Sequence, residues 1–109
     1  MDKIEQSNKM FAKLKRDMPA QLSSFMNFNQ KVKNTDTIDK KHKELILVSL
    51  SVSTQCKWCI AMHIAGAVEV GASKDEILEA AMLAVVMGGG PKLMYMNAVY
   101  EELDKYFNS

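Results

Sequence analysis

The two cysteines of the chain are close together in the segment Cys56-Lys57-Trp58-Cys59, and His63 follows one helical turn later. Residues three or four positions apart share one face of an α-helix, so a helix here would place Cys56, Cys59 and His63 along one stripe. Backbone N–H groups and the helix dipole at a helix N-terminus favour a thiolate over a thiol. The His63 imidazole can serve as the base or as the charge partner of that thiolate. The spacing therefore predicts a redox-active dithiol.

A metal site or an incidental pair would explain the same cysteines, because two thiols so close in sequence cannot crosslink distant parts of a fold. Zinc usually takes four protein ligands, or three and a water at a catalytic site. Cys56, Cys59 and His63 would supply three ligands, and Glu44 is a candidate fourth. We favour redox chemistry and expect neither a metal nor another cofactor.

Glu44 is the fourth candidate site residue, although it is distant along the chain. In one continuous helix it would lie about 18 Å from Cys56, at a rise of 1.5 Å per residue. A reversal of the chain near Ser53 and Thr54 would instead create an antiparallel helix hairpin in which Glu44 faces His63. The carboxylate could then orient the imidazole, directly or through one water, and form a proton relay from Glu44 through His63 to the cysteines.

Helical spacing of apolar residues extends along almost the whole chain, and strand patterns are weak. We expect an all-α fold of about six helices, with residues 1–109 forming a single domain around the central hairpin. The first two expected helices span about 3–18 and 19–33, the third follows a cap at Thr37 or Asp39 and ends near residue 52, and the last three span about 56–70, 74–87 and 91–107. Pro19 suits a first turn, Ser53 or Thr54 an N-cap, and Gly71 a C-terminal glycine. The sequence Ser73-Lys74-Asp75-Glu76 matches a capping box.

The chain has 14 basic and 13 acidic residues and a formal net charge of +1. This balance gives no basic surface of the kind that binds nucleic acid. The N-terminal segment is charged and lacks the apolar run of a signal peptide, and the longest apolar run, residues 80–87, is too short to span a membrane. We therefore expect a cytoplasmic protein without membrane or nucleic-acid partners, in a compartment that keeps thiols reduced.

The third expected helix, which ends near residue 52, and the one expected at 74–87 are apolar on nearly every face. A small domain cannot bury two such helices completely, and an exposed apolar face usually marks an interface. We therefore expect a homo-oligomer. The alternative is a monomer in which both helices are sandwiched inside the fold.

The arrangement of Glu44, the pair Cys56-x-x-Cys59 and His63 resembles the signature of alkylhydroperoxidase D-like proteins in the carboxymuconolactone decarboxylase family. The resemblance extends over about residues 20–107 and includes the stretches 71–80 and 87–91. It implies an all-helical fold built on a helix hairpin and assembled as trimers or hexamers. The best-known redox members carry a second histidine at the position that Trp58 occupies here.

The resemblance also implies an activity. Such proteins use the two cysteines to reduce hydroperoxides, or to pass electrons from a lipoyl-type carrier to a peroxiredoxin. Carried over to this chain, Cys56 and Cys59 would cycle between dithiol and disulfide while His63 and Glu44 relay protons. The expected function is a thiol–disulfide redox enzyme with peroxidase activity, acting on a hydroperoxide or small disulfide with a lipoyl-type or thiol carrier as partner.

Two other functions remain open from the sequence. The family name suggests a carboxymuconolactone decarboxylase-like lyase, although the decarboxylases of the family do not depend on a cysteine pair. A metal-binding or structural role is the third hypothesis. The order in which Cys56 and Cys59 attack is also open, because Cys56 is nearer the helix end and Cys59 is nearer His63.

Overall fold

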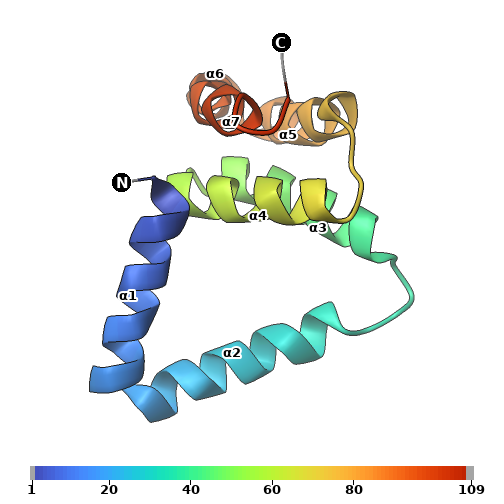
Figure 1. Cartoon of the computed structure of the whole chain (residues 1–109). Helices are drawn as coiled ribbons and strands as arrows, with labels where there is room; N and C mark the ends of the chain where they lie inside the picture. The colour runs from blue at the N-terminus through green and yellow to red at the C-terminus, as the bar shows by residue number, and fades with distance from the viewer. Residues whose placement is uncertain (1, 108–109) are drawn as a thin grey trace. The chain divides into compact units, whose positions relative to one another are not determined.

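The computed structural model describes residues 2–107, and every regular element in this range is helical. The helices are α1 (Lys3–Asp17), α2 (Pro19–Lys33), α3 (Lys40–Ser53), α4 (Lys57–Glu69), α5 (Lys74–Gly88), α6 (Gly90–Met94) and α7 (Met96–Leu103) (Figure 1). The predicted all-α fold class is confirmed. The chain divides into two compact units, with the boundary after Asp39.

The first unit contains α1 and α2, which pack against each other. The Asp2 side chain caps α1 by accepting a hydrogen bond of 2.8 Å from the backbone N–H of Glu5. Pro19 occupies the first turn of α2, as predicted, because its fixed φ suits a position where no backbone donor is required. The apolar side chains of α2 are largely exposed, including Phe25, Phe28 and Val32.

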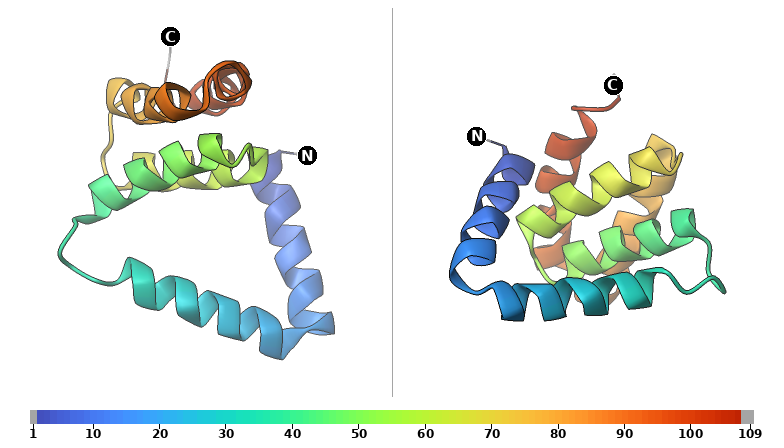
Figure 2. Two further views of the ribbon diagram at one scale, coloured as in Figure 1. Left: turned by 180° about the vertical axis from the view of Figure 1, so that it is seen from behind. Right: turned by 60° about the horizontal axis from the view of Figure 1, so that its bottom comes forward.

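The second unit contains α3 to α7 and holds all four candidate site residues. Helices α3 and α4 pack side by side as one layer, and α5, α6 and α7 lie across them as the other, which two further views also show (Figure 2). The α3–α4 pair is the antiparallel hairpin predicted from the sequence. It is central because α3 packs on α5 while α4 packs on α7.

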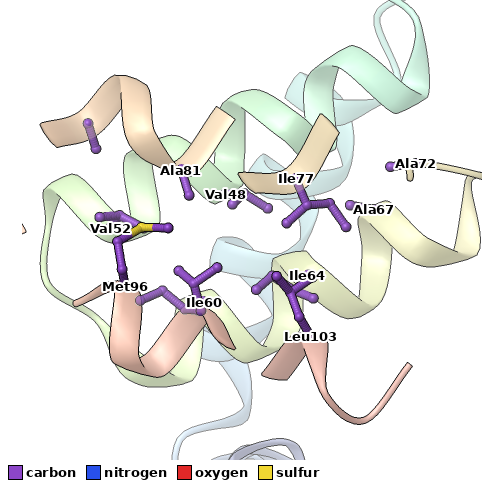
Figure 3. Packing of buried hydrophobic residues seen from close by; sticks show 12 residues of the cluster. Val48, Val52, Ile60, Ile64, Ala67, Ala72, Ile77, Ala81, Met96 and Leu103 are labelled. Atoms are coloured by element: carbon purple, nitrogen blue, oxygen red, sulfur yellow. The ribbon is translucent and has the colours of Figure 1, made fainter. Parts of the chain in front are cut away.

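A single apolar core lies between these two layers (Figure 3). Helices α3, α4, α5 and α7 each contribute side chains to it at helical spacing, so that one stripe of each of these helices is removed from water. The largest fully buried side chains are Val48, Val52, Ile60, Ile64, Ile77, Val99 and Leu103. This core sets the distance and direction of α3 against α4, and therefore the geometry of any site between them.

The helix expected at 91–107 is interrupted, and the prediction of one continuous helix is wrong. Tyr95 separates α6 from α7, and regular α-helix ends at Leu103. Met96 and Val99 on α7 are buried in the core. The break allows α6 to stay beside α5 while α7 crosses to α4.

The predicted C-terminal end of α4 and the predicted start of α5 are both confirmed. Gly71 has a φ of 90°, and the N–H of Ala72 donates to the carbonyl of Ala67 at 2.9 Å, a pattern in which glycine is favoured. Ser73 and Glu76 form both hydrogen bonds of a capping box at the start of α5, at 2.9 and 3.1 Å.

Within residues 2–107, no helix combines the length and apolarity that a bilayer-crossing segment needs.

Candidate functional site

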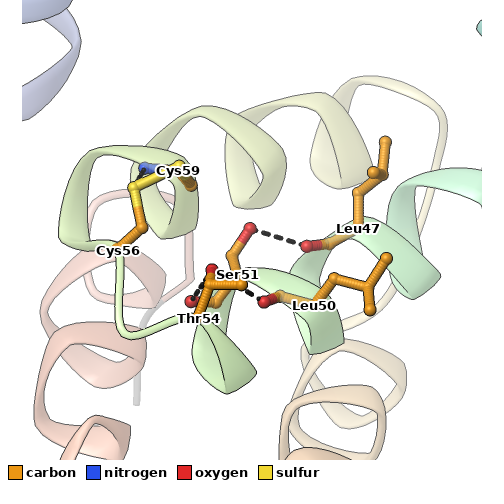
Figure 4. Close-up of a disulfide and its surroundings, with 6 residues drawn as sticks. All are labelled: Leu47, Leu50, Ser51, Thr54, Cys56 and Cys59. Atoms are coloured by element: carbon orange, nitrogen blue, oxygen red, sulfur yellow. Dashed lines mark hydrogen bonds between the residues drawn. A yellow bond between two sulfur atoms is a disulfide. The ribbon is translucent and has the colours of Figure 1, made fainter.

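The site begins at the connection between α3 and α4, where the structure corrects the expected cap. Thr54 ends α3 instead of starting α4, because its hydroxyl donates to the carbonyls of Leu50 at 2.9 Å and Ser51 at 3.3 Å (Figure 4). The N-cap of α4 is Cys56, in extended conformation, and its Sγ accepts a hydrogen bond of 3.1 Å from the backbone N–H of Cys59. The prediction of Ser53 or Thr54 as this N-cap is therefore wrong.

Cys56 and Cys59 are joined by a disulfide, with 5.2 Å between their Cα atoms (Figure 4). The N-cap position explains how the pair can close. A residue outside the helix, followed by one in its first turn, brings two Cβ atoms to the separation that a disulfide requires. The same first turn presents backbone N–H donors to a thiolate when the bond is reduced.

Glu44 and His63 meet across the hairpin, as the sequence predicts. The Oε2 atom of Glu44 lies 3.2 Å from Nδ1 of His63, and the Glu44 side chain is only 11% exposed. An ionised carboxylate can only accept, so it favours the imidazole tautomer with the proton on Nδ1. Nε2 is then the ring nitrogen that can exchange a proton with the rest of the site.

Gly66 is a site residue that the sequence reasoning missed. A Cβ at position 66 would lie 2.7 Å from Oε2 and 2.9 Å from Cδ of Glu44. Any side chain there would therefore displace the carboxylate that contacts His63. A glycine in the middle of an apolar helix is unfavourable for helix formation, and that was the signal available in the sequence.

Three further observations describe the surroundings of these residues. Trp58, between the two cysteines in sequence, is 49% exposed. The larger hollow described, about 510 Å³, lies between α3 and α5 and is lined by none of the four candidate residues. Within residues 2–107, no cluster of three or more His, Cys, Asp or Glu side chains is arranged to hold a metal ion.

Comparisons with known proteins identify the family of the chain. The profile of the carboxymuconolactone decarboxylase family matches residues 19–102. A curated relative is "uncharacterized protein 4 in cox locus" of Paracoccus denitrificans, which is 36% identical over 84 residues, or 74% of this chain and 76% of the relative.

Solved structures of similar proteins share the fold. The apo form of a carboxymuconolactone decarboxylase family protein from Legionella pneumophila aligns with a TM-score of 0.89 and 35% identity over 95% of this chain and 93% of its own. A family protein from Thermotoga maritima, for which involvement in an antioxidative response has been suggested, aligns with a TM-score of 0.83 and 28% identity, covering 94% of this chain and 87% of its own. The chain therefore belongs to the carboxymuconolactone decarboxylase family.

Proposed function

We propose that the protein is a thiol–disulfide oxidoreductase of the alkylhydroperoxidase D-like type, which reduces hydroperoxides or small disulfides. The observation that carries the proposal is the conjunction of a Cys56–Cys59 disulfide at the start of α4 with a Glu44–His63 pair on the same hairpin. Neither a packing role nor a crosslinking role requires both features. A buried carboxylate facing a histidine is a common means of positioning an acid–base group.

The proposed reduction of a hydroperoxide has two steps. The thiolate of one cysteine attacks the distal oxygen of the peroxide, so that an S–O bond forms, the O–O bond breaks, and the alkoxide leaves as an alcohol after protonation. The second thiol then attacks the sulfenic sulfur, which forms the disulfide and releases water. Two electrons pass from the dithiol to the peroxide.

The disulfide is reset by exchange with an external dithiol. One donor thiolate attacks the disulfide and forms a mixed disulfide, and the second donor thiol displaces the enzyme sulfur. A lipoyl-type or thiol carrier fits this step, because its two thiols can close into a disulfide of their own. We place the reaction in the cytoplasm, where such reductants keep thiols reduced.

His63 and Glu44 have separate roles in this proposal. Nε2 of His63 takes the proton from a thiol before attack and returns it to the leaving oxygen. Glu44 holds the ring through Nδ1 and compensates the charge while the imidazole is protonated. Glu44 is therefore a positioning residue for His63.

The first experiment replaces the cysteines. We expect Cys56→Ser and Cys59→Ser each to abolish peroxide-dependent oxidation of a small dithiol such as dihydrolipoamide, because the disulfide needs both sulfurs. Retention of full activity in the double variant would falsify the proposal. Carboxymuconolactone turnover by that same variant would instead support the family's decarboxylase activity.

The other histidine, His42, provides a matched control for the proposed proton relay through His63. His63→Ala should slow the thiol-dependent step by about a hundredfold, within the usual range for general acid–base catalysis. His42→Ala, which removes the other histidine, should leave the rate unchanged, because His42 lies on the α3–α5 side of the hairpin. Equal losses in the two variants would rule out a specific role for His63.

A further inference from the structure

The turn that leads into Cys56 has an unusual backbone. Gln55 has a φ of 55° and is the only residue other than glycine with positive φ in the described range 2–107. Its N–H donates to the carbonyl of Val52 at 3.0 Å, and the N–H of Cys56 donates to the carbonyl of Ser51 at 3.1 Å. This is the Schellman pattern of a helix end, in which glycine normally takes the left-handed position. A glutamine there is disfavoured because its Cβ crowds the backbone.

A long-range hydrogen bond holds the side chain of this residue. Nζ of Lys92, in α6, donates to Oε1 of Gln55 at 2.6 Å, across 37 positions of sequence. The stem of Lys92 lies over Gly88 at the end of α5. A Cβ at position 88 would overlap Cγ of Lys92 and lie 2.8 Å from its Cε atom. The absence of a side chain at Gly88 therefore leaves room for the Lys92 stem.

We propose that Lys92 is a positioning residue for the redox pair, acting through Gln55. The hydrogen bond favours the left-handed conformation of Gln55 and so directs the chain into the extended conformation of Cys56. That conformation puts Sγ of Cys56 over the N–H of Cys59, within bonding distance of the second sulfur. We call the contact of Lys92 with Gln55 the latch. This inference rests on the proposed function in that Cys56 and Cys59 are taken to cycle.

The latch should act on the balance between disulfide and dithiol. The disulfide requires this backbone geometry, whereas the reduced chain can relax when the bond is open. Loss of the latch therefore favours the dithiol. The balance can be measured with glutathione. The protein dithiol gives two electrons and two protons to one glutathione disulfide, which becomes two glutathione thiols while the protein disulfide forms.

The first variant is Lys92→Met, which keeps the apolar stem and removes the donor. We expect the equilibrium constant for disulfide formation against glutathione to fall by about three- to tenfold, the effect of losing one hydrogen bond. Lys74→Met removes the same charge at the opposite end of α5 and should leave the constant unchanged. An unchanged constant in Lys92→Met would overturn the proposal.

A second substitution tests whether Lys92 acts through the backbone of Gln55. Gln55→Gly removes the steric conflict at the left-handed position, so glycine needs no latch to hold the turn. Gln55→Gly should therefore restore the equilibrium constant in the Lys92→Met background. If the double variant stays as low as Lys92→Met, Lys92 does not act through the backbone of Gln55 and the positioning role is wrong.

Gly88→Ala reaches the latch by another route. It should lower the constant about as much as Lys92→Met and have no further effect in that background, because both changes break one contact. Alanine favours the helix at this position, so a fall in the constant would not reflect loss of α5. A Gly88→Ala protein with the original constant would contradict the packing of Lys92 over residue 88.

These measurements can be separated from the test of the proposed function. The glutathione equilibrium needs only the two thiols and no turnover. If peroxidase activity is absent, the latch can still be measured. If turnover depends on the cysteines but the equilibrium constant for disulfide formation is unchanged in Lys92→Met, only the proposal of the latch is refuted.

Discussion

The contact between Glu44 and His63 depends on a residue that carries no side chain. Gly66 lies on α4 next to the Glu44 carboxylate, and a Cβ there would be 2.7 Å from Oε2. The carboxylate is almost buried, so it cannot move far without losing either its contact with His63 or its packing. At the residue scale, therefore, the candidate site consists of a carboxylate, an imidazole, the Cys56–Cys59 disulfide and the space that Gly66 leaves.

Gly66→Ala should impair the site without weakening the helix. Alanine is the better helix former, so the free energy of unfolding should hold or rise, while the displaced carboxylate should lower peroxide-dependent turnover by about tenfold or more. Turnover and urea unfolding are measured on the same preparations. In a Glu44→Ala background the same substitution should have no further effect, because the clash is gone. An equal loss in both backgrounds would show that Gly66 acts elsewhere.

Helix ends decide where the elements begin and how they meet. Glu76, at the start of α5, accepts a hydrogen bond of 2.9 Å from the backbone N–H of Ser73 and pairs with Nζ of Lys41 at 2.9 Å. These contacts lower the pKa of Glu76 from 4.5 to about 2, with the Ser73 backbone as the largest cause and Lys41 next. One carboxylate thus connects the first turns of α3 and α5.

The lowered pKa of Glu76 makes the stability of the fold depend on pH. Because the folded state lowers the pKa of Glu76, its charge stabilises the fold above about pH 4.5 and loses that effect as the pH falls toward 2. We expect wild type to be more stable than Glu76→Gln near neutral pH and the difference to shrink through this window. Urea unfolding at a series of pH values measures it.

Ser73→Ala tests the other half of the same capping box, because it removes the hydroxyl that accepts a hydrogen bond from the N–H of Glu76 and keeps the backbone N–H of residue 73. It should destabilise the protein by about 1 kcal/mol through loss of the N-cap. A stability difference between wild type and Glu76→Gln that is the same at pH 2 and pH 7 would contradict the lowered pKa.

At the scale of the whole molecule, the outer face of α5 stands out. Leu83, Val86 and Met87 are 60%, 77% and 89% exposed, and their spacing puts them on one side of the helix. Apolar residues gathered in this way favour association, in agreement with the homo-oligomer proposed from the sequence. The assembled state remains a prediction.

Two charges on this face should dissociate such an assembly. We expect Leu83→Glu combined with Val86→Glu to shift the protein to monomers in sedimentation experiments, because burying a carboxylate in an apolar interface is unfavourable. Lys74→Glu reverses a charge on the first turn of α5, away from this face, and should leave the assembly intact. A wild-type protein that sediments as a monomer would rule out the proposal, and an assembly that survives the double substitution would place its interface elsewhere.

Much of this protein can be predicted from local sequence. Most helices, the turn at Gly71 and the capping box at Ser73 were predicted correctly, because the hydrogen bonds involved join residues only a few positions apart. The break at Tyr95 was not predicted, since it serves the packing of α6 on α5 and of α7 on α4. The cap of α4 was assigned to Ser53 or Thr54, because their hydroxyls are good caps in general. In the structure the Thr54 hydroxyl bonds back into α3.

The sequence by itself determined the family signature, the helical class and the pairing of Glu44 with His63 through equal distances from a turn. Only the tertiary structure decided that Gly66 makes room for the carboxylate and that Lys92 reaches Gln55. The physical reason is the range of the interactions. Caps and helical stripes follow from neighbouring residues, whereas space and long-range hydrogen bonds exist only after α3, α4 and α5 have packed around one core.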